Sequence, residues 1–330
     1  MAAPTSPTPT DRSSRSSFGS IRQGGLQWDL LPMRLFVQGN EKFWNPAEID
    51  FAQDAEHWRA LDEEQQDAML NTATLFLAGE EAVTEDIQPF MAAMAAEGRL
   101  EDEMYLTQFA FEEAKHVEVW RRWLDAVGVD ADLHGYIEEN PGYQTFFYDK
   151  LPAALDRLHQ DSSPAAQVRA AVIYNQVVEG TLALTGYYLF QRICDITGMF
   201  PGMRELIYHI GRDERRHMAW GTFTCRRHVA ADEANWQVVT DTMDELQQPV
   251  IDLISVRRQQ YEEAGETPFG MDPDETERYA MDRFGRRFGA IESALGSSVD
   301  AVQHGSMEID LEEQFAEEDA ETSRQDVAAR

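Results

Sequence analysis

The stretches EEAKH at residues 112–116 and DERRH at residues 213–217 decide the fold of this 330-residue chain. Each contains a glutamate followed three residues later by a histidine. The two pairs are Glu113 with His116 and Glu214 with His217. At 3.6 residues per turn, positions i and i+3 lie on one face of a helix, so each pair can close on one ion. One such pair arises often by chance, whereas two pairs in separate helices indicate a site for two metal ions.

Two further glutamates lie on apolar helical faces. Glu80 has apolar neighbours at i−4, i+3 and i+7, whereas Glu81 has polar neighbours one turn on, so Glu80 points inward. Glu179 is flanked by apolar positions, and the same comparison places Glu113 rather than Glu112 on an apolar face. Buried carboxylates are costly unless cations pair them. Glutamates and imidazoles without cysteine suit iron or manganese, although a set of surface glutamates with two incidental histidines is the alternative.

The core of the chain reads as helices, with no succession of alternating strands. Apolar periodicity and capping signals predict helices over residues 61–94, 100–127, 144–159, 164–197, 201–231, 233–264 and 274–291. The predicted fold is all-α, a ferritin-like four-helix bundle core with accessory helices. Such bundles hold two metals with two Glu-x-x-His pairs and two further glutamates.

The ends of the chain differ in composition from its core. Residues 1–20 are rich in Ser, Thr and Pro, and we expect a disordered segment there. Residues 21–295 are expected to form one di-metal domain, and residues 296–330 an acidic, flexible tail.

The charge balance is strongly acidic, with 60 Asp and Glu against 28 Lys and Arg and a net charge of −32. Such a surface repels phosphate backbones, so we expect no nucleic-acid partner. Lysine occurs at three positions only, Lys42, Lys115 and Lys150. Acid-rich, lysine-poor chains resemble those of salt-accumulating microbes, because concentrated salt screens self-repulsion. The alternative is a biased tail, but residues 296–330, with ten acids and two arginines, carry only −8 of the charge.

Membrane and export signals are absent from the sequence. There is no apolar run of the roughly 18 residues that a spanning helix needs, and no secretory signal begins the chain. Two cysteines, Cys194 and Cys225, cannot build a disulfide framework. We expect a cytoplasmic protein with no membrane span.

The chain order Glu, Glu-x-x-His, Glu, Glu-x-x-His resembles the small subunit of ribonucleotide reductase. The segment FWNP at residues 43–46 and the adjacent Asp213 and Glu214 strengthen this likeness. The segment AGEEAVTEDIQPF at residues 78–90, and Tyr174 ahead of Glu179, resemble more closely the ribonucleotide reductase small-subunit-like ligand-binding oxidases. The resemblance covers roughly residues 21 to 290.

This resemblance implies a mixed Mn/Fe centre. Carried over by position, the manganese side would be held by Glu80, Glu113 and His116. The iron side would be held by Glu179, Glu214 and His217. An Fe/Fe centre stays open, because both metals accept the same ligands.

The resemblance also implies O2 activation, an ether cross-link between Tyr174 and Val83, and a long-chain fatty acid-like ligand in an apolar tunnel with its carboxylate at the metals. We expect a homodimer. Val83 is i+3 from Glu80, which by itself places its side chain beside the site. Without the resemblance, Val83 reads as core packing and Tyr174 as a buried, hydrogen-bonded tyrosine.

Trp44 and Asp213 admit two interpretations. In reductases the corresponding Trp, Asp and His form an electron-transfer path, here Trp44, Asp213 and His116. The simpler interpretation, which we favour, is that Asp213 accepts a hydrogen bond that fixes the tautomer of His116.

Other functions compete with an oxidase. A true reductase subunit would usually have Asp in place of Glu80 and a radical tyrosine at Trp120, and its tail would end in an aromatic-bearing segment rather than QDVAAR. An iron-storage cage needs about half this length. A di-iron oxygenase or desaturase with a diffusible acyl substrate stays open, because the same ligands serve it.

Overall fold

The computed structural model describes residues 17–264 and 267–304. Most of the predicted N-terminal segment, residues 1–16, and residues 305–330 of the predicted tail lie outside the described residues. The described part of the chain is helical and contains no strand, which confirms the predicted all-α class.

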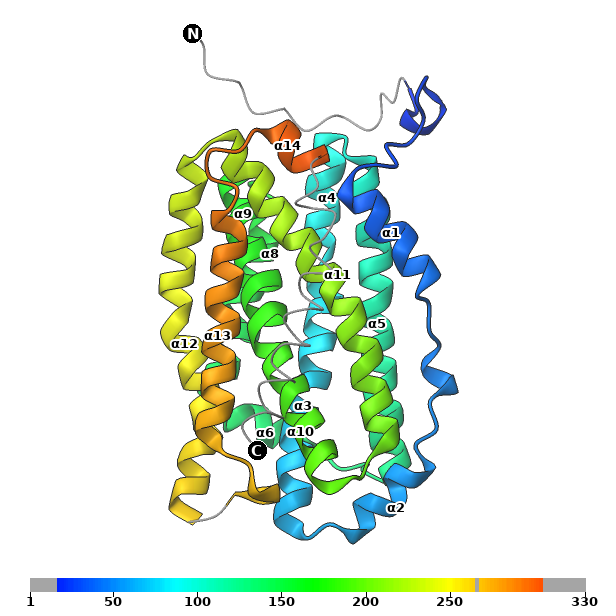
Figure 1. The fold of residues 1–330 in the computed structure, drawn as a ribbon, viewed down its shortest axis with the longest axis vertical. Coiled ribbons are helices and arrows are strands. Elements are labelled where there is room, and N and C mark those ends of the chain that lie inside the picture. The colour runs from blue at the N-terminus through cyan, green and yellow to red at the C-terminus, as the bar shows by residue number, and fades with distance from the viewer. Residues whose placement is uncertain (1–16, 265–266, 305–330) are drawn as a thin grey trace.

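Long helices run along the long axis of the molecule, as Figure 1 shows. The inner elements are α3 (Glu63–Asp86), α5 (Leu100–Val127), α11 (Pro201–Ala231), and the continuous run of α9 (Pro164–Ala171), η5 (Val172–Ala183) and α10 (Leu184–Thr197). Two further long helices, α12 (Ala234–Ala264) and α13 (Pro273–Glu292), lie along one side of this group (Figure 1).

Shorter elements connect and cover the long helices. They are η2 (Gly19–Ile21), α1 (Leu31–Glu41), η3 (Pro46–Glu48), α2 (Ala52–Ala60), α4 (Gln88–Glu97), α6 (His134–Glu138), α7 (Pro141–Gln144), η4 (Thr145–Lys150), α8 (Leu151–Arg157), η6 (Pro268–Gly270) and α14 (Val299–His304). Four of them, η2, α1, η3 and α2, precede the first helix that the sequence predicted.

Local sequence signals set several helix ends. Asp62 caps α3 by accepting from the Gln65 backbone, and the Gln65 side chain accepts in return from the Asp62 backbone. Gly98 and Gly128 take left-handed conformations at the ends of α4 and α5, where a side chain would be strained. The helices predicted at 100–127 and 201–231 are confirmed at those bounds.

Two predicted helices are more complex than the sequence indicated. The single helix expected over residues 61–94 is wrong, because it divides at Ile87 into α3 and α4, and Pro89 supplies no N–H to continue the first ladder. The helix expected over 164–197 is continuous but changes to π-helical geometry through η5.

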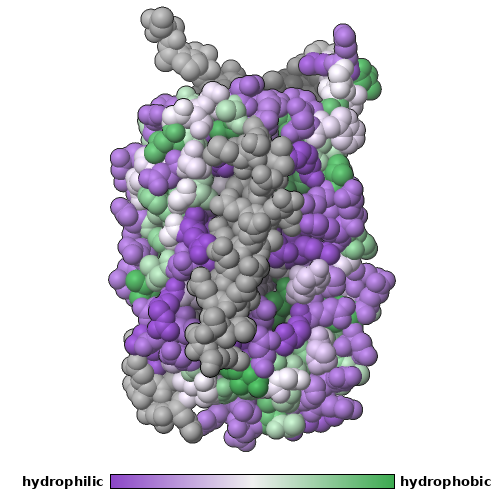
Figure 2. Space-filling view, viewed as in Figure 1, coloured by the Kyte–Doolittle hydropathy of each residue, from purple (hydrophilic) through white to green (hydrophobic). Residues whose placement is uncertain are grey.

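A dense aromatic and aliphatic core fills the bundle. Trp120 and Trp123 are fully buried, and Phe76 stacks on Trp120 with ring centroids 5.1 Å apart. The described surface in Figure 2 is mostly hydrophilic, in line with the acidic composition. Among the described residues, no helix combines the length and apolarity required to cross a bilayer.

Candidate metal centre

Six predicted ligand side chains meet at the middle of the bundle. They come from α3, α5, η5 and α11, and all are buried. Their donor atoms form two overlapping groups, in each of which all atoms lie within 4.8 Å of one another. One group is Glu80, Glu113, His116 and Glu214, and the other is Glu113, Glu179, Glu214 and His217. Glu113 and Glu214 belong to both groups.

Both histidines turn Nδ1 toward the glutamates. Nδ1 of His116 lies 3.2 Å from Glu80 Oε2 and 3.5 Å from Glu214 Oε1. Nδ1 of His217 lies 3.1 Å from Glu113 Oε1 and 3.6 Å from Glu179 Oε1. Each ring therefore offers the same nitrogen to the centre of the cluster.

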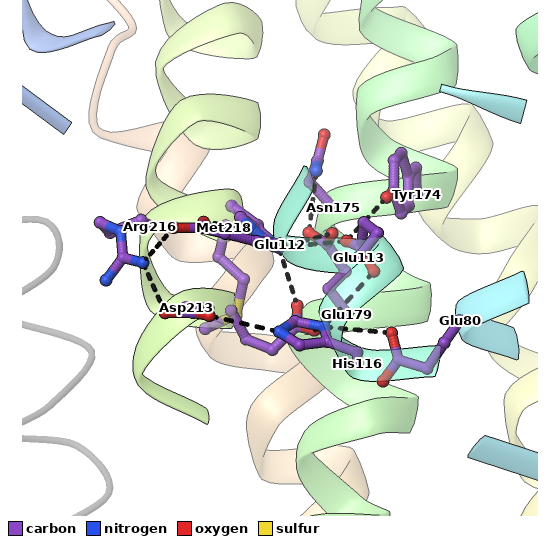
Figure 3. A network of polar contacts seen from close by, with 12 residues as sticks. Glu80, Glu112, Glu113, His116, Tyr174, Asn175, Glu179, Asp213, Arg216 and Met218 are labelled. Carbon is purple, nitrogen blue, oxygen red and sulfur yellow. Dashed lines mark hydrogen bonds and ion pairs between the residues drawn. The ribbon is translucent and has the colours of Figure 1, made fainter. Parts of the chain in front are cut away.

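The opposite nitrogen of each ring faces a further carboxylate. His116 Nε2 lies 3.4 Å from Asp213 Oδ2, and His217 Nε2 lies 3.0 Å from Glu112 Oε2. A proton on Nε2 leaves the Nδ1 lone pair free for an ion, which is the arrangement that metal-bound histidines need. Asp213 lies beside His116, and Trp44 Nε1 donates to Asp213 Oδ2 at 2.7 Å. Figure 3 shows this side of the site, where His116 lies between Asp213 and Glu80.

The structure corrects the sequence prediction for Glu112. Helical periodicity placed only Glu113 on an apolar face, yet Glu112 is 3% exposed. Its oxygens contact Arg216 and His217 of α11. The apolar-face test failed because α11 supplies a cation and an imidazole to this flank of α5 instead of apolar groups. By contrast, Glu81 is exposed, as predicted.

Burial and close charges shift the protonation of the cluster. Burial raises the pKa of Glu80 well above its ordinary value, and burial together with the nearby Glu214 does the same to Glu179. Burial also raises the pKa of Glu113, but hydrogen bonds from His116 and His217 outweigh it, so the pKa of Glu113 is lowered. Without cations, this packing of carboxylates favours the protonated form at part of the site.

The donor set fits a pair of cations. Within the described residues, three buried carboxylate oxygens accept no hydrogen bond: Glu113 Oε2, Glu179 Oε1 and Glu214 Oε2. Buried carboxylate oxygens are normally hydrogen-bonded, so three of them around one centre indicate that ions complete it. The structure thus contains a buried Glu/His site for a metal pair.

Val83 and Tyr174 line the same cavity as the glutamates of the site. Tyr174 is buried, and its hydroxyl donates to Glu113 Oε1 at 3.1 Å (Figure 3). Burial and the charge of Glu113 raise the pKa of the Tyr174 phenol well above its ordinary value. The cavity continues away from the site between mainly apolar side chains, among them Phe147, Leu182, Leu253 and Ile254.

Several residues around the site were not identified from the sequence. Asn175 donates to Glu179 Oε2 at 2.8 Å, and the Tyr187 hydroxyl lies 3.4 Å from Glu214 Oε1. Arg216 and Lys115 are buried beside Asp213. The signal for Arg216 was its place inside the DERRH motif, one turn after Asp213.

Two other histidines, His209 and His228, lie outside the cluster. His209 stacks on Trp44 with ring centroids 5.0 Å apart, and His228 Nε2 lies 3.0 Å from Gln167 Oε1.

The bundle and its paired Glu/His groups define a ferritin-like di-metal carboxylate protein. A family model described as ribonucleotide reductase, small chain, matches residues 33–292. The R2-like ligand-binding oxidase from Sulfolobus acidocaldarius is 36% identical, with 87% of this chain and 98% of that chain covered and a TM-score of 0.79. The chain belongs to the ribonucleotide reductase small-chain family and, within it, to the R2-like ligand-binding oxidases, which are di-metal oxidoreductases.

Two other similar structures carry metals. An R2-like ligand-binding oxidase with an aerobically reconstituted Mn/Fe cofactor is 37% identical, covers 84% of this chain and 98% of its own, and has a TM-score of 0.80. A glycine-to-leucine variant with an aerobically reconstituted Fe/Fe cofactor has the same identity, coverage and TM-score. Relatives thus hold either metal pair in this fold.

Proposed function

We propose that this protein is an O2-activating Mn/Fe oxidase that binds a long-chain fatty acid-like ligand and joins Tyr174 to Val83 by an ether bond. The observation that carries the proposal is one cavity. Glu80, Glu113, Val83 and Tyr174 all line it, and the Tyr174 hydroxyl is hydrogen-bonded to Glu113.

Six side chains are proposed to hold the metals. Glu80, Glu113 and His116 would form the manganese side. Glu179, Glu214 and His217 would form the iron side. When bound, the pair supplies oxidation by O2, which amino-acid side chains cannot perform by themselves. An Fe/Fe pair would use the same six side chains.

The protein side chains set up the cross-link. Tyr174 keeps its proton until the reaction because its pKa is raised, and its hydrogen bond to Glu113 Oε1 orients the hydroxyl. The new C–O bond replaces the Tyr174 O–H bond and one C–H bond of Val83. Two protons and two electrons leave, and O2 takes up both. The buried, apolar surroundings exclude water that would compete with this step.

The apolar cavity supports an acyl ligand. Its inner end is lined by the glutamates, and its walls by residues such as Leu182 and Ile254. A fatty acid would place its chain along these walls and its carboxylate at the cations, in keeping with the apolar lining and few polar groups of small-molecule sites.

An oxygenase with a diffusible acyl substrate is the second candidate. Arg258 and Glu277 line the same cavity and are 35% and 34% exposed. This part of the lining is therefore partly open to solvent, which favours exchange of a ligand.

A peptide digest tests the proposal. Protein reconstituted with Mn(II) and Fe(II) in air should yield one linked pair of peptides, containing Val83 and Tyr174 and lighter than their sum by two hydrogens. Tyr174→Phe should still bind metals but form no link. Separate Val83 and Tyr174 peptides at full mass would refute the cross-link and leave the oxygenase as the better account. A cytoplasmic location and a homodimer stay predictions of the sequence.

A further inference from the structure

A single buried guanidinium joins the two outer carboxylates of the site. Arg216 has no exposed surface, and its Nη2 donates to Glu112 Oε1 at 2.7 Å and to Asp213 Oδ1 at 2.6 Å. Its Nη1 donates to the Arg212 carbonyl at 3.0 Å, which fixes the guanidinium on α11. Figure 3 shows Arg216 beside Asp213, on the side of the site away from Glu80.

The second oxygen of each carboxylate continues to a histidine. Asp213 Oδ2 lies 3.4 Å from His116 Nε2, and Glu112 Oε2 lies 3.0 Å from His217 Nε2. The polar contacts therefore run without interruption from His116 through Asp213, Arg216 and Glu112 to His217. We call this series the arginine arch.

We infer that Arg216 is a positioning residue that orients the histidines of both metal half-sites at once. The inference rests on the proposed six-ligand assignment. Both carboxylates are buried, and removal of Arg216 would take away the positive charge that they share. A carboxylate that turns away no longer fixes the tautomer and orientation of its histidine.

The two ends of the arch are not equivalent. Asp213 also accepts from Trp44 Nε1 at 2.7 Å and from Lys115 Nζ at 3.2 Å. Within the described part of the chain, Glu112 has Arg216 and His217 as its hydrogen-bonding partners. Asp213 therefore keeps a hydrogen bond from a cation, Lys115, when Arg216 is removed, whereas Glu112 keeps only its contact with His217 among the described residues. Loss of Arg216 should weaken both half-sites, and the His217 half more.

Lys115 provides the matched comparison. It is buried like Arg216, and its hydrogen bond goes to the Asp213 end of the arch alone. Lys115→Met should therefore weaken only the His116 half, whereas Arg216→Met should weaken both. If Arg216 only stabilised the fold, Arg216→Met would lower the stability of the protein. The two variants would then not differ in which half-sites bind Mn(II) less tightly.

The experiment measures Mn(II) binding to each half-site of the full chain. Equilibrium dialysis gives the affinities of the first and second ion, and anomalous diffraction at the manganese edge gives the occupancy of each half. Removal of a residue that orients metal ligands typically costs about 10–100-fold in affinity, which we expect at both halves in Arg216→Met and at the His116 half in Lys115→Met. Circular dichroism of the metal-free variants confirms that they are folded, and Arg216→Gln, which also removes the charge, replaces Arg216→Met if that variant does not fold.

The result that would overturn the inference is a folded Arg216 variant in which either half-site binds Mn(II) as the wild type does. Mn(II) binding to the wild type distinguishes this outcome from a failure of the proposed function. If the wild type binds two ions between the six side chains, only the coupling is wrong. If it does not, the ligand assignment itself is wrong.

Discussion

At the scale of single residues, the site is a cluster of acids that protein contacts alone do not satisfy. Burial raises the pKa of Glu80 and Glu179. Burial lowers the pKa of His116, but its ion pair with Glu80 outweighs this and raises it well above the ordinary value. Glu179 thus favours its protonated form when no metal is bound, and the coupled Glu80 and His116 share a proton between them, whereas metals bind the deprotonated forms.

Metal binding should therefore release protons. At neutral pH, groups with raised pKa values must deprotonate as the ions enter, so the apparent affinity should increase with pH. Titration of metal-free protein with Mn(II) in weak buffer containing a pH indicator measures this release. An affinity that stays constant between about pH 6 and 8 would contradict the protonation assigned here.

The sequence predicted the members of the buried cluster better than their surroundings. Glu80, Glu113 and Glu179 lie on apolar faces, so helical periodicity was enough to predict that they point inward. Glu112 and Arg216 satisfy each other across two helices, and no pattern within one helix reveals such a contact. Polar groups that neutralise one another in the interior become visible only when the packing of α5 against α11 is known.

At the scale of elements, the close approach of α11 and η5 positions one of the carboxylates. Gly221 of α11 faces Asn175 of η5, whose side chain donates to Glu179. A Cβ at Gly221 would lie 2.1 Å from Asn175 Cβ, so only glycine fits between the two elements. The sequence predicted both helices but not the π-helical geometry of η5, because a 3.6-residue period was assumed throughout.

Gly221→Ala should force these two elements apart. Overpacking of this kind costs about 1–3 kcal/mol, more than the ~1 kcal/mol that alanine gains over glycine in a helix. Thermal unfolding of the metal-free protein should show a lower Tm. Gly211→Ala on the same helix is the control, because a Cβ there meets nothing within 4 Å, and its Tm should stay level or rise. Equal Tm values for the two variants would show that the contact is not tight.

At the scale of the whole molecule, net charge dominates the surface electrostatics. The chain carries −32, while individual exposed ion pairs such as Arg157 with Asp161 contribute about 0–1 kcal/mol each. Salt weakens those pairs but also screens the repulsion among the excess acids. Because acids outnumber basic residues 60 to 28, the screening of repulsion should prevail.

The Tm should therefore rise between dilute buffer and molar KCl. Differential scanning calorimetry of metal-loaded protein at a series of KCl concentrations measures the shift. A Tm that is level or falls over this range would contradict a fold adapted to concentrated salt.

The central claim, a two-ion centre held by four glutamates and two histidines, is tested most directly by the metal-to-protein ratio after reconstitution. We predict two ions per chain for the wild type and for His134→Ala, an exposed histidine that lies outside both donor groups. His116→Ala and His217→Ala should each lower the ratio, and the double variant should bind little metal, because each half-site would lack its one imidazole. A ratio that stays at two in the double variant would contradict the ligand assignment.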